Sequence, residues 1–236
     1  MPIPYAMLVS IHQPHYLPWA GYFDKIQKAD VFFILDTVQF QKNGFMNRNF
    51  INSSQGELLL TIPISNDKRI GSTIEKTQIN NNINWQKKHF SSINQAYSKS
   101  PFFNKFSNDL EIFYTARYGD FSYYCLEMLH FWLEILNIKT KIVLASDLES
   151  TGVGSQYILN ICKALKADSY LSGPMGREYL LLDNFKDNDV NVIFHNYIAA
   201  PYRQNNDIFV PNLSIIDVIS NSSTPLDLIK LGSKNE

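Results

Sequence analysis

Near its N-terminus the chain holds the pattern that most constrains its fold. Apolar runs at residues 7–11 and 31–35 flank a loop with two prolines and a stretch at 19–28 whose apolar side chains recur at helical spacing. Two strands joined by one helix are typical of a parallel pair, because parallel strands need a long crossover connection. That crossover is almost always right-handed. The pattern therefore predicts a βαβ unit.

The same alternation returns in the second half of the chain. Strand-like apolar runs are expected at residues 141–145, 169–172 and 191–194, and a helix capped by Ser155 is expected at 156–166. Strands that alternate with helices predict the α/β class. We expect a mostly parallel, Rossmann-like sheet flanked by helices.

The middle third of the chain has a different pattern. A strand at residues 58–64 is expected to pair with residues 73–79. Helical patterns follow at 84–97, where Asn84 is the expected cap, at 101–115 and at 120–136. No repeat or Gly/Ser-rich linker separates these segments from the rest. We therefore expect a single α/β domain over residues 1–236, with about 84–137 as a helical insertion or cap.

Composition excludes several classes of protein. The formal net charge of -1 provides no general attraction for nucleic acid or an anionic membrane. No apolar run approaches the ~18 residues of a membrane span, and the first residues lack the basic start and apolar core of a secretory signal. The two cysteines form no C-x-x-C motif, so we expect neither a disulfide framework nor a zinc ribbon. A cytoplasmic location is expected.

The first candidate site is the motif His12-Gln13-Pro14-His15, which follows the opening strand. Open α/β sheets bind ligands at the carboxyl ends of their strands. Two histidines here could hold a metal, but no H-E-x-x-H or facial-triad spacing accompanies them, so we expect no metal site. They could instead stabilise phosphate charge, as in nucleotidylyl transferases and adenylate-forming amide ligases. A solvent-facing loop with incidental histidines is the remaining interpretation.

The second candidate site follows the next strand. Asp36 and Gln39 occupy a position where a carboxylate is often a ligand or general base, and about as often a turn cap. Lys42, Asn47 and Arg48 come soon after. Two cations in a glycine-containing loop could clamp a carboxylate or the diphosphate of a nucleotide sugar, since guanidinium offers a bidentate fork. A solvated loop explains the same residues equally well.

The block at residues 11–49 resembles the WbqC-like family. It carries the Gln-Pro, the second proline and the Gly-Tyr-Phe, then a strand that ends in Asp, a Gln-containing stretch and an Asn-Arg-Asn. The matching residues are Gln13, Pro14, Pro18, Gly21, Tyr22, Phe23, Asp30, Asp36, Gln39, Lys42, Asn47, Arg48 and Asn49. Tyr202 and Gln204 fall on a second block near the C-terminus, and the resemblance covers nearly the whole chain.

The chain departs from the family pattern in two places. His12 and His15 stand where family members commonly carry other residues, and Phe45 stands where tryptophan is common. The first departure counts against the histidine pair as the catalytic centre. The expected site therefore moves to Gln13 and the residues from Asp36 to Arg48.

The resemblance implies a role in O-antigen and other surface-polysaccharide biosynthesis. Amide formation between an activated carboxylate and the amine of a nucleotide-linked amino sugar is the hypothesis, with glycyl as one acyl group. In it Asp36 deprotonates the amine, and Lys42 and Arg48 hold anionic oxygens. The expected substrate-binding residues are Gln13, His15, Tyr16, Trp19, Tyr22, Gln39, Asn47, Tyr202 and Gln204.

Other interpretations stay open at this point. ATP or an acyl-CoA could supply the activated acyl group, and no cofactor is certain. A non-catalytic protein that binds a nucleotide sugar or docks to a partner of the same pathway is the alternative, as is an adenylate-forming amide ligase. A homodimer is left open.

Overall fold

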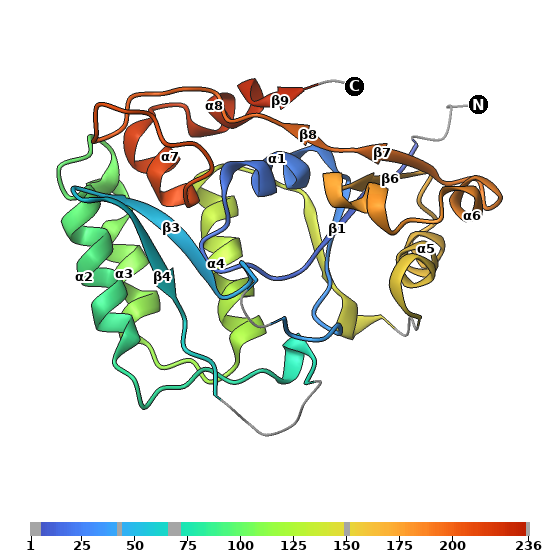
Figure 1. Cartoon of the computed structure of the whole chain (residues 1–236), viewed down its shortest axis with the longest axis horizontal. Coiled ribbons are helices and arrows are strands. Elements are labelled where there is room, and N and C mark those ends of the chain that lie inside the picture. Colours follow the sequence, from blue (N-terminus) through green and yellow to red (C-terminus); the bar gives the residue numbers. More distant parts are fainter. Residues whose placement is uncertain (1–5, 42–43, 66–71, 149–151, 235–236) are drawn as a thin grey trace.

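A computed structural model describes residues 6–41, 44–65, 72–148 and 152–234. Its centre is a five-stranded sheet of order β5-β2-β1-β6-β7, in which every neighbouring pair is parallel. The strands are β1 (Leu8–His12), β2 (Val31–Ile34), β5 (Lys141–Leu144), β6 (Ser169–Ser172) and β7 (Asn191–Phe194). Helices flank the sheet (Figure 1), so the expected α/β class is confirmed.

The strand order places a switch point in the middle of the sheet. From β1 the chain continues to β2 and later β5 on one side, whereas β6 and β7 extend the sheet on the other side. The two directions diverge between β1 and β6. In open parallel sheets ligands bind in the crevice at such a point, outside the carboxyl ends of the strands.

The opening βαβ unit forms as the sequence predicts. Helix α1 (Ala20–Lys28) starts directly after the second proline of the loop and buries Tyr22, Phe23 and Ile26. At the amino ends of the strands, Asp30 accepts a hydrogen bond from the backbone of Leu8 at 2.8 Å. The crossover is thus held against the sheet by the apolar side chains of α1 and by the Asp30 carboxylate after the helix.

Alternate residues of the strands point into two apolar cores. Phe32 and Ile34 join a core with α1, α4 (Phe121–Ile135), α7 (Ile215–Asn221) and α8 (Pro225–Leu231). Val31 and Phe33 join the opposite core with α5 (Gly154–Ala164) and α6 (Leu182–Lys186). Figure 1 shows α5 and α6 at one end of the molecule and the middle helices at the other.

The middle segment packs into the first of these cores. It consists of the hairpin β3 (Arg48–Ser53) and β4 (Gly56–Thr61), and of α2 (Trp85–Tyr97), α3 (Ser107–Thr115) and α4. Short 3-10 turns are η1 (Ile74–Lys76), η2 (Phe103–Lys105), η3 (Ala145–Asp147) and η4 (Pro174–Glu178). A second small ribbon pairs β8 (Asn196–Tyr197) with β9 (Ser233–Lys234).

Several local expectations were wrong because tertiary contacts overrode them. The polar stretch at 48–53 is strand β3, which pairs with β4. Residues 73–79 contain η1 at 74–76 instead of a continuous strand, and the bridge between Ile64 and Ile79 is what remains of the expected pairing. The helix expected from residue 101 begins at Ser107, after η2, since the backbone at Phe102 bonds Ser220 of α7.

Two expected helix caps are also absent. Asn84 precedes α2 without a side-chain capping bond. Ser155 lies inside α5, and its hydroxyl accepts a hydrogen bond from the backbone of Leu181 at 2.9 Å, so it ties α5 to the segment before α6. Within the described ranges, no helix combines the length and apolar character needed to cross a membrane.

Candidate functional site

Four polar side chains gather where β1 ends, beside the switch point of the sheet. We call His12, His15, Tyr22 and Lys25 the β1 cluster. The ring centres of His12 and His15 lie 4.7 Å apart, and those of His12 and Tyr22 lie 4.9 Å apart. His15 stacks on Tyr22 with ring centres at 5.4 Å. The loop between β1 and α1 therefore folds back on the helix and places both imidazoles against its first turns.

Lys25 is the most unusual member of the cluster. It projects from α1, is only 4% exposed, and donates a hydrogen bond of 3.3 Å to the carbonyl oxygen of Ile11. Among the described residues no carboxylate lies within ion-pair distance of its Nζ. Burial penalises the ammonium form and lowers the pKa of Lys25 to about 7.

The two imidazoles lie on the solvent side of Lys25 and are partly exposed. Burial and the nearby Lys25 charge lower the pKa of His15 to about 4, and the same causes lower the pKa of His12. Nδ1 of His12 lies 3.2 Å from the carbonyl oxygen of Gln13. A carbonyl only accepts, so we assign the proton to Nδ1, which leaves a lone pair on Nε2.

The buried carboxylate of Asp24 connects α1 to His195, the residue after β7. Nε2 of His195 lies 2.7 Å from Oδ2 of Asp24, and Lys28 approaches the same carboxylate at 3.3 Å. Burial alone would raise the pKa of Asp24, but hydrogen bonds from His195 and Gln27 and the Lys28 charge bring it below its usual value. Asp24 is therefore occupied by these partners and does not neutralise Lys25.

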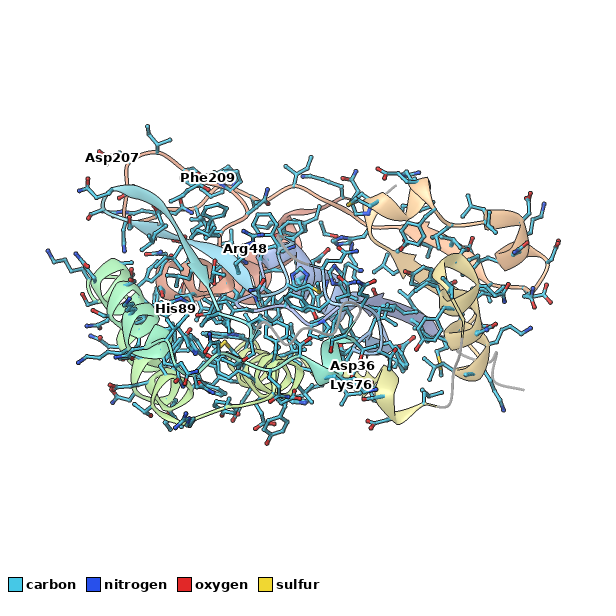
Figure 2. The ribbon with its side chains drawn as sticks, turned by 60° about the horizontal axis from the view of Figure 1, so that its bottom comes forward. Asp36, Arg48, Lys76, His89, Asp207 and Phe209 are labelled. Atoms are coloured by element: carbon cyan, nitrogen blue, oxygen red, sulfur yellow. The ribbon has the colours of Figure 1, made fainter. Side chains whose placement is uncertain are left out.

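Asp36 lies at the carboxyl end of β2, beside η1 (Figure 2). Its carboxylate accepts hydrogen bonds from the backbone and hydroxyl of Ser146 at 3.0 and 2.7 Å, and its carbonyl oxygen accepts one from Glu75. The residue is 2% exposed, and burial raises its pKa. These contacts join β2 to the segment after β5 and leave little of Asp36 for a ligand.

The basic loop after β2 lies against the loop after β1. The backbone of Tyr16 donates a hydrogen bond of 2.7 Å to the carbonyl oxygen of Met46. Arg48, labelled in Figure 2, donates from Nε to Gly44 at 2.9 Å, and its terminal nitrogens have no partner among the described residues. Asn47 donates to Ile62 at 2.8 Å.

Two other predicted residues of this stretch are placed differently. Gln39 is exposed and pairs through its backbone with Thr73. Lys42 lies outside the described residues.

The predicted aromatic residues have packing partners. Tyr16 is fully buried, and its hydroxyl bonds Nδ1 of His89 at 2.8 Å and the hydroxyl of Tyr114 at 2.9 Å. Trp19 packs edge-on against Tyr197 at 5.4 Å between ring centres, and its indole also covers Gly21. Tyr16 thus has no surface for stacking on a ligand, whereas Trp19 keeps a partly exposed edge.

Tyr202 and Gln204 meet a buried carboxylate instead of the β1 cluster. Their side chains donate to Oδ1 of Asp217 at 2.6 and 2.9 Å, and Tyr97 donates to Oδ2 at 3.0 Å. Gln204 also exchanges hydrogen bonds with the backbone of Val210. This network fastens the C-terminal segment to α7 and α2.

The structure thus brings Gln13, His15 and Tyr22 together with residues that the sequence analysis did not single out. Lys25 and Asp24 were missed because a lysine and an aspartate in an amphipathic helix normally face water. One signal could have revealed Lys25, since it lies three residues after Tyr22, on the face that carries apolar side chains. His195 lies far along the chain, and no local pattern connects it to β1.

The chain resembles known proteins over most of its length. A model of the WbqC-like protein family matches residues 13–225. The chain is similar to the Uncharacterized protein Rv1507c of Mycobacterium tuberculosis, with 30% identity over 215 residues, which are 90% of this chain and 93% of that protein. No solved structure matches the chain.

Proposed function

The chain belongs to the WbqC-like protein family, and we propose that it transfers an acyl or aminoacyl group to the amine of a nucleotide-linked amino sugar. The sugar would serve the biosynthesis of O-antigen or another surface polysaccharide. One observation supports this proposal above others: at the switch point of a parallel sheet, the β1 cluster holds two neutral imidazoles and a buried amine that has no carboxylate partner among the described residues. Such a site suits an anionic substrate that must also lose a proton.

The reaction requires a free amine, because an ammonium ion has no electron pair with which to attack. In the proposal, Nε2 of His12 takes the proton from the sugar ammonium. The amine then attacks the acyl carbon of a thioester or acyl adenylate. The tetrahedral intermediate expels the thiolate or AMP as the amide forms, and the second proton of the amine passes to the leaving group or to solvent. His12 thus takes the role of base that the sequence suggested for Asp36, and Asp36 acts as a positioning residue through Ser146.

The remaining roles follow from accessibility. Arg48 offers two terminal nitrogens with no partner among the described residues, so it is assigned to anionic oxygens of the donor or acceptor, and Lys42 is a further candidate for this role. Gln13 and Trp19 are partly exposed and are assigned to sugar contacts. Holding both substrates in one site would supply much of the rate enhancement by positioning.

The test is a mass-spectrometric assay of the nucleotide amino sugar. The protein is incubated with the sugar and an acyl-CoA, or with the sugar, ATP and glycine, and the sugar should gain the mass of the acyl group. His12→Gln should reduce turnover by about 100-fold or more, because general-base catalysis contributes that much. His130→Gln is the matched control, since His130 is exposed on α4 and should leave turnover unchanged.

Three outcomes would revise this proposal in different ways. Binding of the sugar without product from either donor would indicate a nucleotide-sugar-binding protein of the same pathway. Full turnover by His12→Gln would show that His12 is not the general base and that the β1 cluster does not carry the proton transfer. Product formed only with ATP and glycine, with release of AMP, would identify an adenylate-forming ligase.

A further inference from the structure

We propose that Lys25 and His15 form a phosphate-binding subsite at the carboxyl end of β1, and that the cluster takes up protons when a phosphate enters. Lys25 is the buried member of this subsite, and His15 and His12 are its partly exposed members. The identification of the ligand as the diphosphate of a nucleotide sugar rests on the proposed function, whereas the subsite itself does not.

The buried part of the subsite lacks a negative charge. A buried ammonium is unfavourable unless an anion or several hydrogen bonds compensate it. Lys25 has one hydrogen bond of 3.3 Å to Ile11, and no carboxylate of the described chain reaches its Nζ. A ligand oxygen would supply the missing partner.

The groups near Nζ of Lys25 carry no negative charge that could compensate it, so an anionic ligand can fill that role. Among the described residues, Lys25, His15 and His195 are the titratable groups with an electrostatic influence on His12, and each can only be neutral or positive. Cys125 acts on Tyr22, and burial raises the pKa of its thiol and keeps it neutral. The phenol of Tyr22 donates to the carbonyl oxygen of Gln13 at 3.2 Å. Asp24 is the nearby carboxylate, and it is shared by His195, Gln27 and Lys28.

The number of donors favours a phosphate over a carboxylate. Lys25 and His15 offer hydrogen-bond donors at this end of β1, and Nε2 of His12 becomes a third donor when the ring takes up a proton. A phosphate group presents several oxygens and up to two negative charges, and charge-assisted hydrogen bonds to it are about twice as strong as neutral ones. A carboxylate ligand has two oxygens and one charge, and would leave one of these donors without a partner.

Proton uptake follows from the same arrangement. Burial holds Lys25 partly neutral near neutral pH, and the imidazoles are neutral. A dianion beside them stabilises the protonated forms, so its binding draws protons from solution. The same negative charge would bring His12 closer to the basicity that the proposed transfer requires.

The experiment is isothermal titration calorimetry of the full chain with inorganic pyrophosphate and with sulfate, a dianion that does not titrate near neutral pH. Sulfate binding is measured in two buffers of different ionisation enthalpy, so that proton uptake appears as a buffer-dependent heat. We expect net uptake near pH 7 and an affinity that falls as the pH rises above the pKa of Lys25. Lys25→Met should weaken pyrophosphate binding about tenfold or more. Lys141→Met removes the same charge from an exposed position at the amino end of β5 and should change the affinity by less than about twofold.

Three results would overturn the subsite: no binding of either anion, undiminished pyrophosphate binding by Lys25→Met, or sulfate binding without proton uptake. His15→Asn provides the second variant and should weaken pyrophosphate binding in the same direction. Competition between pyrophosphate and a nucleoside diphosphate sugar distinguishes a nucleotide diphosphate from free phosphate as the natural occupant.

The outcome is separable from that of the proposed function. If the protein binds pyrophosphate through Lys25 but acylates no sugar, the subsite is supported and the transferase is contradicted. If the protein acylates the sugar and Lys25→Met still binds pyrophosphate normally, the transferase is supported and the subsite is contradicted.

Discussion

At the scale of single residues, Lys25 stands out because it opposes folding. Its amine is buried with one weak hydrogen bond, while an apolar side chain of the same length would pack there without that penalty. Residues that lower stability without an evident structural benefit are typical of functional sites. Asp36 shows the opposite case, since its bonds to Ser146 explain it structurally.

Lys25→Met is expected to stabilise the protein by about 1 to 3 kcal/mol below neutral pH. The folded-state pKa of about 7 lies below the ordinary lysine value of 10.5, so the unfolded chain binds more protons between these values. The stability of the wild type therefore rises with pH across that window, and the advantage of the variant shrinks. Urea unfolding from about pH 6 to pH 10 measures both effects. A variant less stable than the wild type at pH 6 would show that the ammonium has a partner.

At the scale of elements, the start of α1 depends on a close contact between two residues of the family block. A Cβ added to Gly21 would lie 2.3 Å from the indole of Trp19, so only glycine lets the ring lie across the helix. That ring also contacts Tyr197, which follows β7 and His195. The contact thus sets how α1 presents Tyr22 and Lys25 to the loop after β1.

Gly21→Ala should therefore destabilise the protein by about 1 to 3 kcal/mol, the usual range for overpacking. It should also weaken anion binding at the β1 cluster, because the helix must shift. Gly173→Ala is the matched control, since open space surrounds Gly173 and the added methyl group meets nothing. Thermal unfolding and pyrophosphate titration of both variants provide the measurement. Equal stability of the two variants would mean that Trp19 moves aside freely.

At the scale of the whole molecule, buried neutral histidines connect stability to pH. His89 joins α2 to the loop after β1 through Tyr16, and burial lowers its pKa to about 4, as it does for His15. Between about pH 6.5 and pH 4 the unfolded chain binds protons that these residues in the folded chain do not. The free energy of unfolding should therefore fall as the pH drops through this window.

His89→Gln should flatten that loss by about 2 to 3 kcal/mol between pH 7 and pH 4, because one pKa unit corresponds to about 1.4 kcal/mol. His130→Gln, on an exposed part of α4, should leave the pH dependence as in the wild type. Urea unfolding at a series of pH values compares the three proteins. An unchanged slope in His89→Gln would mean that His89 is protonated in the folded protein.

The sequence by itself determined the α/β class, the opening βαβ unit and the strands of the sheet. These follow from local hydrophobic periodicity and from the crossover that parallel strands require, and both are written in neighbouring residues. The strand β3 and the turn η1 were not predicted. Strand β3 forms because it pairs with β4, and η1 is fixed by the hydrogen bond from the backbone of Glu75 to Asp36.

Only the tertiary structure decided which polar residues meet. In the folded chain Lys25 lies close enough to His12 and His15 to lower their pKa values, His195 bonds Asp24 from the far half of the chain, and Tyr202 and Gln204 bond Asp217. The physical reason is that burial and long-range approach determine whether a charged side chain lies in water or against a partner. Neither is encoded in the spacing of residues along a single helix or loop.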